Sequence, residues 1–237
     1  MPAREEHREL RGALARGDGG AVVHLLGSGS WPADCMQLIG DGLRVALRQH
    51  IGGADDLARE CVALLRDRGW DGDDELADAL QAQLGEAPAQ LLKPLVVDLE
   101  ELSMVLEGDP VQCGGRIDLS TGEVWPQSAL DYAIESGEID EDDDDPARWM
   151  WVECEGSRAG YRDMEWFIAG LDDDRVADRL SRAISGRGAF RRFKDVLSAW
   201  PDLMARWFAF AEDRQRGRAR AWLADAGYAA SSVTVGR

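Results

Sequence analysis

The segment that decides the fold of the last third of the chain is residues 186–195, Gly186-Arg187-Gly188-Ala189-Phe190-Arg191-Arg192-Phe193-Lys194-Asp195. Two glycines come directly before a pattern in which Phe190, Phe193 and Leu197 recur every three or four residues. This spacing places the apolar side chains on one face of a helix and the cations on the other. The segment therefore predicts a tight turn followed by an amphipathic helix.

Helical patterns continue around this segment and predict helices over residues 159–227. At the other end of the chain, residues 1–88 contain short apolar stripes with helical spacing, closed by glycines such as Gly17 and Gly69. Glycine directly after a helical stripe is typical of a helix C-terminus. We therefore expect residues 1–88 to form a small helical module that ends near Pro88.

Strand patterns lie between these helical regions. Residues 112–127 predict a β-hairpin, because Ile117 and Val124 flank a turn in which Gly122 can adopt a positive φ. Further short strands are predicted at residues 95–97 and 149–152, and Asp98 predicts the N-cap of a helix over residues 99–106. The expected fold class is predominantly α (α+β). A helical module, 1–88, precedes a helix-rich domain, 91–237, that contains a small antiparallel hairpin or sheet.

The charge of the chain is strongly negative and unevenly distributed. Its 237 residues carry 45 acidic and 27 basic side chains, a net charge of −18. Residues 91–155 hold 18 acidic and 3 basic side chains, whereas residues 156–237 are mildly basic. Within the acidic block, residues 138–146 predict an exposed loop, because like charges repel one another. A field of this sign opposes nucleic-acid binding at long range but permits a local basic site.

Targeting and membrane signals are absent from the pattern. No apolar run approaches the roughly 20 residues that a membrane span needs, and the charged N-terminus resembles neither a secretory signal nor a transit peptide. The cysteines Cys35, Cys61, Cys113 and Cys154 form no Cys-x-x-Cys pair, so we expect free, structural thiols. These features predict a cytoplasmic protein that does not associate with membranes.

Three motifs carry a resemblance to a known family. They are Asp118-Leu119-Ser120-Thr121-Gly122-Glu123-Val124, Gly160-Tyr161-Arg162-Asp163-Met164-Glu165, and the segment at 186–195, followed by Trp207, Phe210, Arg214, Trp222 and Leu223. Through these residues, the stretch from about 95 to 227 resembles the bacterial Uncharacterised Protein Family 0158. The resemblance implies one compact α-rich domain with a small β element, and it implies no activity, cofactor or catalytic residue.

The first candidate site is the predicted helix start at residues 186–194. Glycines there expose backbone N–H groups, and the helix dipole adds partial positive charge. We expect this helix start to bind an anion, either a phosphate or a carboxylate of a partner. The candidate binding residues are Gly186, Arg187, Gly188, Arg191, Arg192 and Lys194. The structural alternative is a tight turn before a helix whose cations face only water.

The second candidate site is the acidic run. Its partner-binding candidates are Asp142, Asp143, Asp144 and Asp145, which would meet a basic surface of another protein. The alternative is an exposed loop with no partner. The run lacks the spacing and the glycine of an EF-hand, so we expect no metal.

A third candidate surface is formed by C-terminal arginines interleaved with aromatic residues, namely Arg206, Arg214, Arg216, Arg218 and Arg220 with Trp207, Phe210 and Trp222. Arginine beside an aromatic ring suits single-stranded nucleic acid. Two alternatives remain open: the aromatic residues are buried in the core, or the acidic run folds over these arginines and masks them.

Enzyme chemistry has little support in the sequence. The three histidines, His7, His24 and His50, all lie in the predicted N-terminal module, so no histidine-based site is expected in the family-like region. We expect no catalytic residue, metal or cofactor. The preferred interpretation is a cytoplasmic, non-enzymatic protein-binding or adaptor protein. A nucleic-acid-binding protein that uses the C-terminal arginines is the alternative, and an enzyme of unrecognised type is the second alternative.

Overall fold

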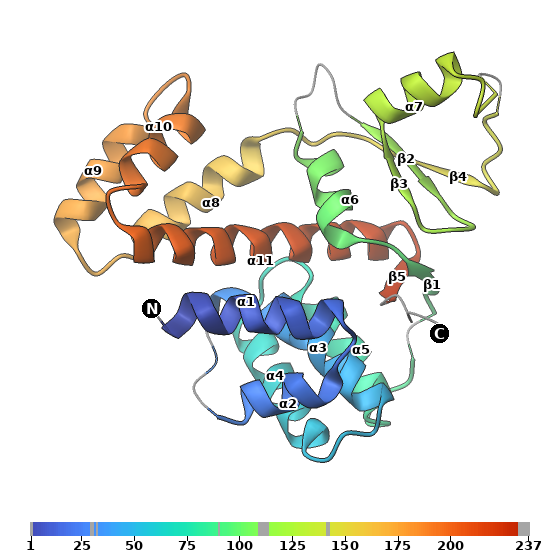
Figure 1. Cartoon of the computed structure of the whole chain (residues 1–237), viewed down its shortest axis with the longest axis horizontal. Helices are drawn as coiled ribbons and strands as arrows, with labels where there is room; N and C mark the ends of the chain where they lie inside the picture. Colours follow the sequence, from blue (N-terminus) through green and yellow to red (C-terminus); the bar gives the residue numbers. More distant parts are fainter. Residues whose placement is uncertain are drawn as a thin grey trace. The chain divides into compact units, whose positions relative to one another are not determined.

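The computed structural model describes residues 2–28, 31, 33–89, 91–108, 114–140 and 143–231. Helices dominate these residues, and the β-structure among them is limited to short strands (Figure 1). The predominantly α (α+β) class expected from the sequence is confirmed, including the small antiparallel sheet. The chain divides into two compact units. Unit 1 contains residues 1–90 and 159–214, and unit 2 contains residues 91–158 and 215–237.

The first part of unit 1 is a helical bundle. It consists of α1 (Pro2–Ala15), α2 (Gly19–Leu26), the 3-10 turn η1 (Ala33–Cys35), α3 (Met36–Arg48), α4 (Ala54–Arg68) and α5 (Asp73–Gln83). Helix α3 lies at its centre, where it contacts α1, α2, α4 and α5, and every residue from Met36 to Leu47 is buried. A helix in this position must pack on all sides, which accounts for the apolar residues on more than one of its faces.

The second part of unit 1 comprises α8 (Arg158–Ala169), α9 (Asp174–Ile184), α10 (Ala189–Leu197) and the part of α11 (Pro201–Asp225) that ends at Arg214. Four aromatic rings fill its core. Phe193 packs edge-on against Trp207 with ring centroids 4.7 Å apart, and Phe167 lies against Trp207 and Phe210 at 5.3 and 5.7 Å. The burial of Trp207 and Phe210 thus follows the first of the two alternatives left open by the sequence, whereas Trp222 is only partly buried.

Unit 2 contains two small sheets. Strands β1 (Lys93–Val96) and β5 (Tyr228–Ser231) pair in parallel, and β2 (Gly115–Asp118) lies between β3 (Val124–Pro126) and β4 (Trp149–Val152) in an antiparallel sheet. One face of this sheet contributes Ile117 and Val152 to a core that includes α6 (Leu99–Leu106) and the end of α11. Helix α7 (Gln127–Glu135) packs against Trp149 and Trp125 on the other side.

The hairpin turn between β2 and β3 explains the first family-like motif. The carboxylate of Asp118 accepts hydrogen bonds from the backbone N–H and the hydroxyl of Ser120. Gly122 has a φ of +79°, and a Cβ atom at this position would lie 1.6 Å from the carbonyl oxygen of Val96. Glycine is therefore required both by the backbone conformation and by the close approach of the β1 strand.

Three elements differ from the sequence expectations. Helix α7 was not predicted, because it is only nine residues long and its buried side chains, Leu130 and Ala133, make a weak stripe. Helix α11 runs through 25 residues, a length that the sequence did not predict. Strand β5 was not predicted either, because its pairing with β1 is a non-local contact that local patterns do not reveal.

The two compact units do not contain the same residues as the two expected domains. Residues 159–214 group with residues 1–90, and Ala209 of α11 lies in the same apolar cluster as α1–α5. Whether residues 1–88 and 91–237 fold independently stays a prediction.

The cysteines follow the expectation in part. Cys35 and Cys61 are buried free thiols, whereas Cys154 is disulfide-bonded, which corrects the expectation that every thiol is free. Cys113 lies outside the described residues. None of the described helices combines the length and the apolar character needed to cross a membrane. The cytoplasmic location stays a prediction.

Candidate functional site

The predicted helix start at residues 186–194 is present as the turn between α9 and α10. Gly186 and Gly188 both have positive φ, +80° and +74°, and Gly188 is the N-cap of α10. No side chain caps the first turn of this helix, because glycine has none to offer. The two-glycine turn and the amphipathic helix are therefore as predicted.

Arg192 has a different role from the other predicted anion ligands. Its guanidinium folds back over the end of α9, where Nε donates to the carbonyl oxygen of Ala183 at 3.0 Å. Its other nitrogens donate to the carbonyl oxygens of Ser185 at 2.6 Å, Gly186 at 3.2 Å and Arg187. The last carbonyls of a helix lack intrahelical partners, and Arg192 supplies donors to them. It therefore holds the turn together, while Arg187, Arg191 and Lys194 are exposed.

The acidic run contacts the sheet of unit 2. Asp143 accepts hydrogen bonds from Arg148 at 2.7 Å and from the indole Nε1 of Trp149 at 3.1 Å. Asp144 accepts one from the indole of Trp151 at 3.2 Å. Asp142 lies outside the described residues. The run is thus anchored at two of its predicted partner-binding residues, by Arg148 and Arg116 in the sheet region.

One face of the sheet is built from tryptophan and arginine. Arg116 of β2 lies opposite Trp125 on one side and Trp151 on the other, so the three side chains share a face. The guanidinium of Arg116 stacks on the Trp151 ring at 3.9 Å and donates to the backbone carbonyl of Asp143 at 2.8 Å. Two donors in this row, Arg116 Nε and Trp125 Nε1, are buried without a hydrogen-bond partner.

A second arginine ties the same loop to the hairpin. Arg148 bonds Asp118 at 3.1 Å as well as Asp143. Burial alone would raise the pKa of Asp118, but the hydrogen bonds from Ser120 and Arg148 outweigh it and hold the pKa below its ordinary value. Asp118 is therefore an ionised structural carboxylate at neutral pH.

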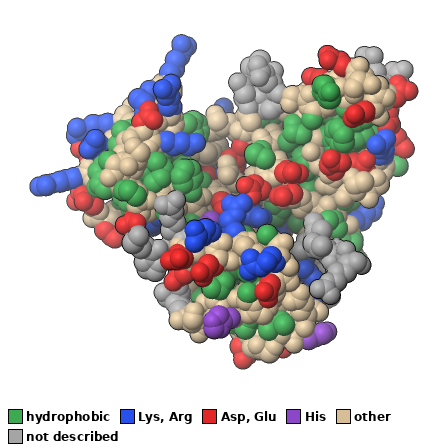
Figure 2. All heavy atoms as spheres, in the orientation of Figure 1, with side chains coloured by type: hydrophobic (Ala, Val, Ile, Leu, Met, Phe, Trp, Pro, Cys, Tyr) green, Lys and Arg blue, Asp and Glu red, His purple; other side chains and the backbone are tan. Residues whose placement is uncertain are grey.

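The outer surface around this loop combines exposed rings and carboxylates. We define the acidic face as α7, the described part of loop 138–146 and β4. Tyr132 of α7 is 69% exposed, Trp151 is 51% exposed, and the side chain of Asp144 is 66% exposed. Asp131, Glu135 and Glu138 are exposed on the same segment. Figure 2 shows red side chains among green ones over the region that Figure 1 labels α7 and β2–β4.

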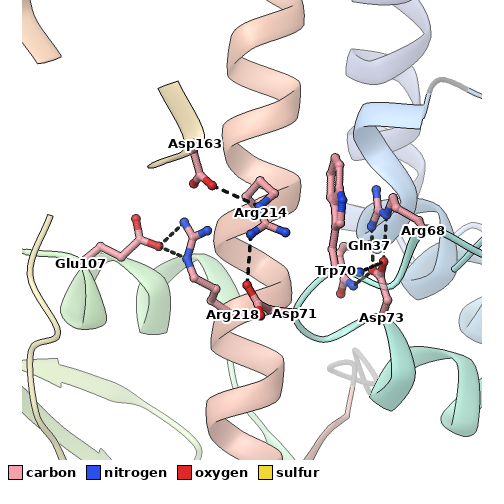
Figure 3. A network of polar contacts seen from close by, with 9 residues as sticks. All are labelled: Gln37, Arg68, Trp70, Asp71, Asp73, Glu107, Asp163, Arg214 and Arg218. Carbon is pink, nitrogen blue, oxygen red and sulfur yellow. Dashed lines mark hydrogen bonds and ion pairs between the residues drawn. The ribbon is translucent and has the colours of Figure 1, made fainter. Parts of the chain in front are cut away.

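A separate polar network is buried in unit 1 (Figure 3). The guanidinium of Arg68 bonds Asp73 at 2.7 Å and also Asp213, and Gln37 donates to both carboxylates through its amide and its backbone N–H. Two buried carboxylates thus share one guanidinium. Burial raises the pKa of Asp213 to about 6, against the opposing effect of Arg68.

The second family-like motif contributes Asp163 to a set of contacts beside this network, which are centred on Arg214. Arg214 of α11 bonds Asp163 of α8 and Asp71, both at 3.1 Å. Its guanidinium lies 4.9 Å from the Trp70 ring centroid and 4.6 Å from that of Trp166 (Figure 3). An arginine between two rings and two carboxylates is held by cation–π and ionic contacts. Asp163 and Arg214 therefore join α8 to α11.

These arrangements contain no recognisable catalytic set. Most of the clustered carboxylates are paired with arginine, which favours fixed ion pairs over proton transfer. Among the described residues, no group of three or more His, Cys, Asp and Glu side chains is placed to hold a metal ion. His7 lies 3.3 Å from Glu212 within unit 1 and belongs to no larger cluster of this kind.

Sequence reasoning missed the tryptophan and arginine row. The alternation of Trp149 and Trp151 in a predicted strand places both rings on one face, and this signal was available. The pairing of Arg116 with Trp151 was not, because it depends on strand register. The burial of Arg68 and Asp213 depends on contacts between distant helices and has no local signal.

Comparisons with known proteins agree with the motifs. Residues 118–232 match the model of an Uncharacterised protein family (UPF0158). The curated UPF0158 protein PA5073 of Pseudomonas aeruginosa is 24% identical over 140 residues, which cover 56% of this chain and 85% of that protein. The family-model match over residues 118–232 and this relative both support membership of this uncharacterised family. No solved structure gives a significant match.

Proposed function

We propose that this protein is a non-enzymatic binding protein that docks a basic partner protein on its acidic face. The observation that carries the proposal is the exposure of Tyr132 and Trp151 on elements that also carry the exposed carboxylates Asp131, Glu135, Glu138 and Asp144. Tryptophan and tyrosine supply much of the binding energy of protein interfaces. Carboxylates around them would steer a basic surface toward the site and exclude an acidic one.

The contacts beneath the acidic face support this role. The Trp151 ring is stacked on Arg116 and bonded to Asp144, so its orientation is fixed before a partner arrives. A side chain that is already ordered loses little conformational entropy on binding. The loop that carries Asp143 and Asp144 is likewise held to the sheet by arginine.

The alternative function through the C-terminal arginines receives less support. Arg214 is buried between its partners, Arg206 bonds Asp34 at 3.0 Å, and Arg218 bonds Glu107 at 2.7 Å (Figure 3). A guanidinium that is already paired must lose its partner before it binds phosphate, and this cost opposes binding. The pairing of these three arginines therefore opposes nucleic-acid binding through them.

The test is capture of partners from the cells of origin at low salt after nuclease treatment. Two variants alter the acidic face: Glu138→Lys with Asp144→Lys reverses its charge, and Tyr132→Ala removes its most exposed ring. The matched control, Glu60→Lys with Asp172→Lys, changes the net charge equally at exposed carboxylates of unit 1.

We expect a protein that the wild type and the control retain and that both acidic-face variants lose. Purified partner should then bind the wild type with an affinity that falls as salt is raised. Loss of the bound material with nuclease, or equal loss from the control variant, would refute the proposal.

A further inference from the structure

The charge of the chain reverses locally at one place in unit 1. Residues 179–194 contain six basic side chains and no acidic one, between Asp178 and Asp195, in a protein whose net charge is −18. A continuous basic run of this length in an acidic chain defines a local site for an anion. The acidic face in unit 2 leaves this run unexplained.

The structure places most of these cations at the turn between α9 and α10. We define the basic turn as Arg182, Arg187, Arg191 and Lys194, all of which are exposed; the side chains of Arg182 and Arg191 retain 78% and 91% of their exposure. Figure 2 shows blue side chains extending outward over the region that Figure 1 labels α9 and α10.

The other two cations of the run have structural roles. Arg192 caps the carbonyls at the end of α9, and the guanidinium of Arg179 lies over the Trp200 ring at 5.3 Å. Arg192 thereby fixes the turn that presents its neighbours. Two cations of the basic turn have acidic partners in their own helices: Arg182 pairs with Asp178, and Arg191 lies 3.9 Å from Asp195. Pairs of this kind on an exposed helix surface contribute little energy and exchange readily for another anion.

An aromatic ring lies within the basic turn. Phe190 is the second residue of α10, two residues after the N-cap Gly188, and is 36% exposed, although Phe193 of the same helix is fully buried. The same helix start has no side-chain cap. Exposed cations beside a ring suit a strand of linked phosphates and bases, because cations neutralise the backbone and the ring stacks on a base.

We propose that the basic turn binds a single-stranded nucleic acid, with its cations on the phosphates and Phe190 against a base. Single strands fit better than an acidic protein, because the four cations are exposed and those with partners are held only by exposed pairs within one helix. Such cations can follow a flexible run of phosphates, whereas a protein interface favours ordered, desolvated charges. This inference is independent of the acidic face and of the function proposed for it.

Fluorescence anisotropy with a labelled 20-nucleotide oligothymidylate tests the proposal on the full chain. Four phosphate contacts predict that affinity falls about 50-fold between 50 and 200 mM salt. Replacing Arg187 and Arg191 by Glu leaves two contacts, so the fall should shrink to about sevenfold, and affinity at 50 mM salt should drop about tenfold or more.

Two further variants separate charge from stacking. Arg8→Glu with Arg162→Glu alters the net charge equally at exposed cations outside the basic turn, and we expect less than about a twofold change in affinity. Phe190→Ala should weaken binding about fivefold or more without changing the salt dependence, because stacking releases no counterions. Circular dichroism verifies that each variant is folded.

Three results would overturn the proposal. The first is the absence of binding by the wild type at 50 mM salt. The second is an equal loss of affinity in the Arg8 and Arg162 control. The third is competition by polyglutamate as strong as by unlabelled oligothymidylate, since this would mean that the turn recognises negative charge rather than nucleic acid.

Discussion

The contrast between the neighbouring residues Arg191 and Arg192 gives the sharpest prediction about the fold. Arg192 donates one partly buried hydrogen bond, to Ala183, and exposed ones to Ser185, Gly186 and Arg187. A partly buried bond from a charged donor contributes about 1 kcal/mol, and the exposed bonds together contribute about as much. Arg192→Ala should therefore lower the free energy of unfolding by about 2 kcal/mol.

Arg191→Ala is the matched change, because this side chain is 91% exposed and lies 3.9 Å from Asp195. Its effect on stability should stay within about 0.5 kcal/mol. Thermal melts followed by circular dichroism should show Tm lower by about 4–8 °C for the Arg192 variant and nearly unchanged for the Arg191 variant. The affinity for the oligonucleotide should fall in the Arg191→Ala variant. Equal shifts in Tm for the two variants would refute the assignment of Arg192 as the cap of α9.

Two other predictions concern the hairpin and the buried network. In urea unfolding, Gly122→Ala should lower the free energy of unfolding by more than about 3 kcal/mol, because a Cβ atom would meet the carbonyl oxygen of Val96. Gly137 also has a positive φ but lies in open space, so Gly137→Ala should lower it by only about 1 kcal/mol. Burial raises the pKa of Asp213 from 3.8 to about 6. Between about pH 4 and 6 the folded protein therefore holds a proton that the unfolded chain releases. The contribution of this residue to the free energy of unfolding falls as the pH rises through that range. In urea titrations at several pH values, wild type should gain stability relative to Asp213→Asn as pH is lowered from 6 to 4, and a constant difference would contradict this reasoning.

The family-like motifs have structural roles wherever the structure describes their contacts. Asp118 and Gly122 form the hairpin turn, Asp163 holds Arg214, and Arg192 caps α9. We therefore seek the function among exposed side chains such as Tyr132, Trp151 and the basic turn.

Local patterns predicted most of the helices and the hairpin, because glycine turns and apolar spacing act within a few residues. The strand β5 and the single helix α11 could not be predicted in this way. The first depends on pairing with β1, more than 130 residues earlier in the chain, and the second on packing along a whole helix. The site followed the same rule: exposed cations and acids were found from sequence, whereas the anchoring of Asp143 by Arg148 and the capping by Arg192 required the fold.

The most direct measurement of the central claim is hydrogen exchange of the full chain with and without its purified protein partner. Binding on the acidic face predicts that amides of α7, loop 138–146 and β4 become protected, while residues 179–194 exchange as in the free protein. Protection centred on residues 179–194, or spread with no preference for the acidic face, would contradict the account.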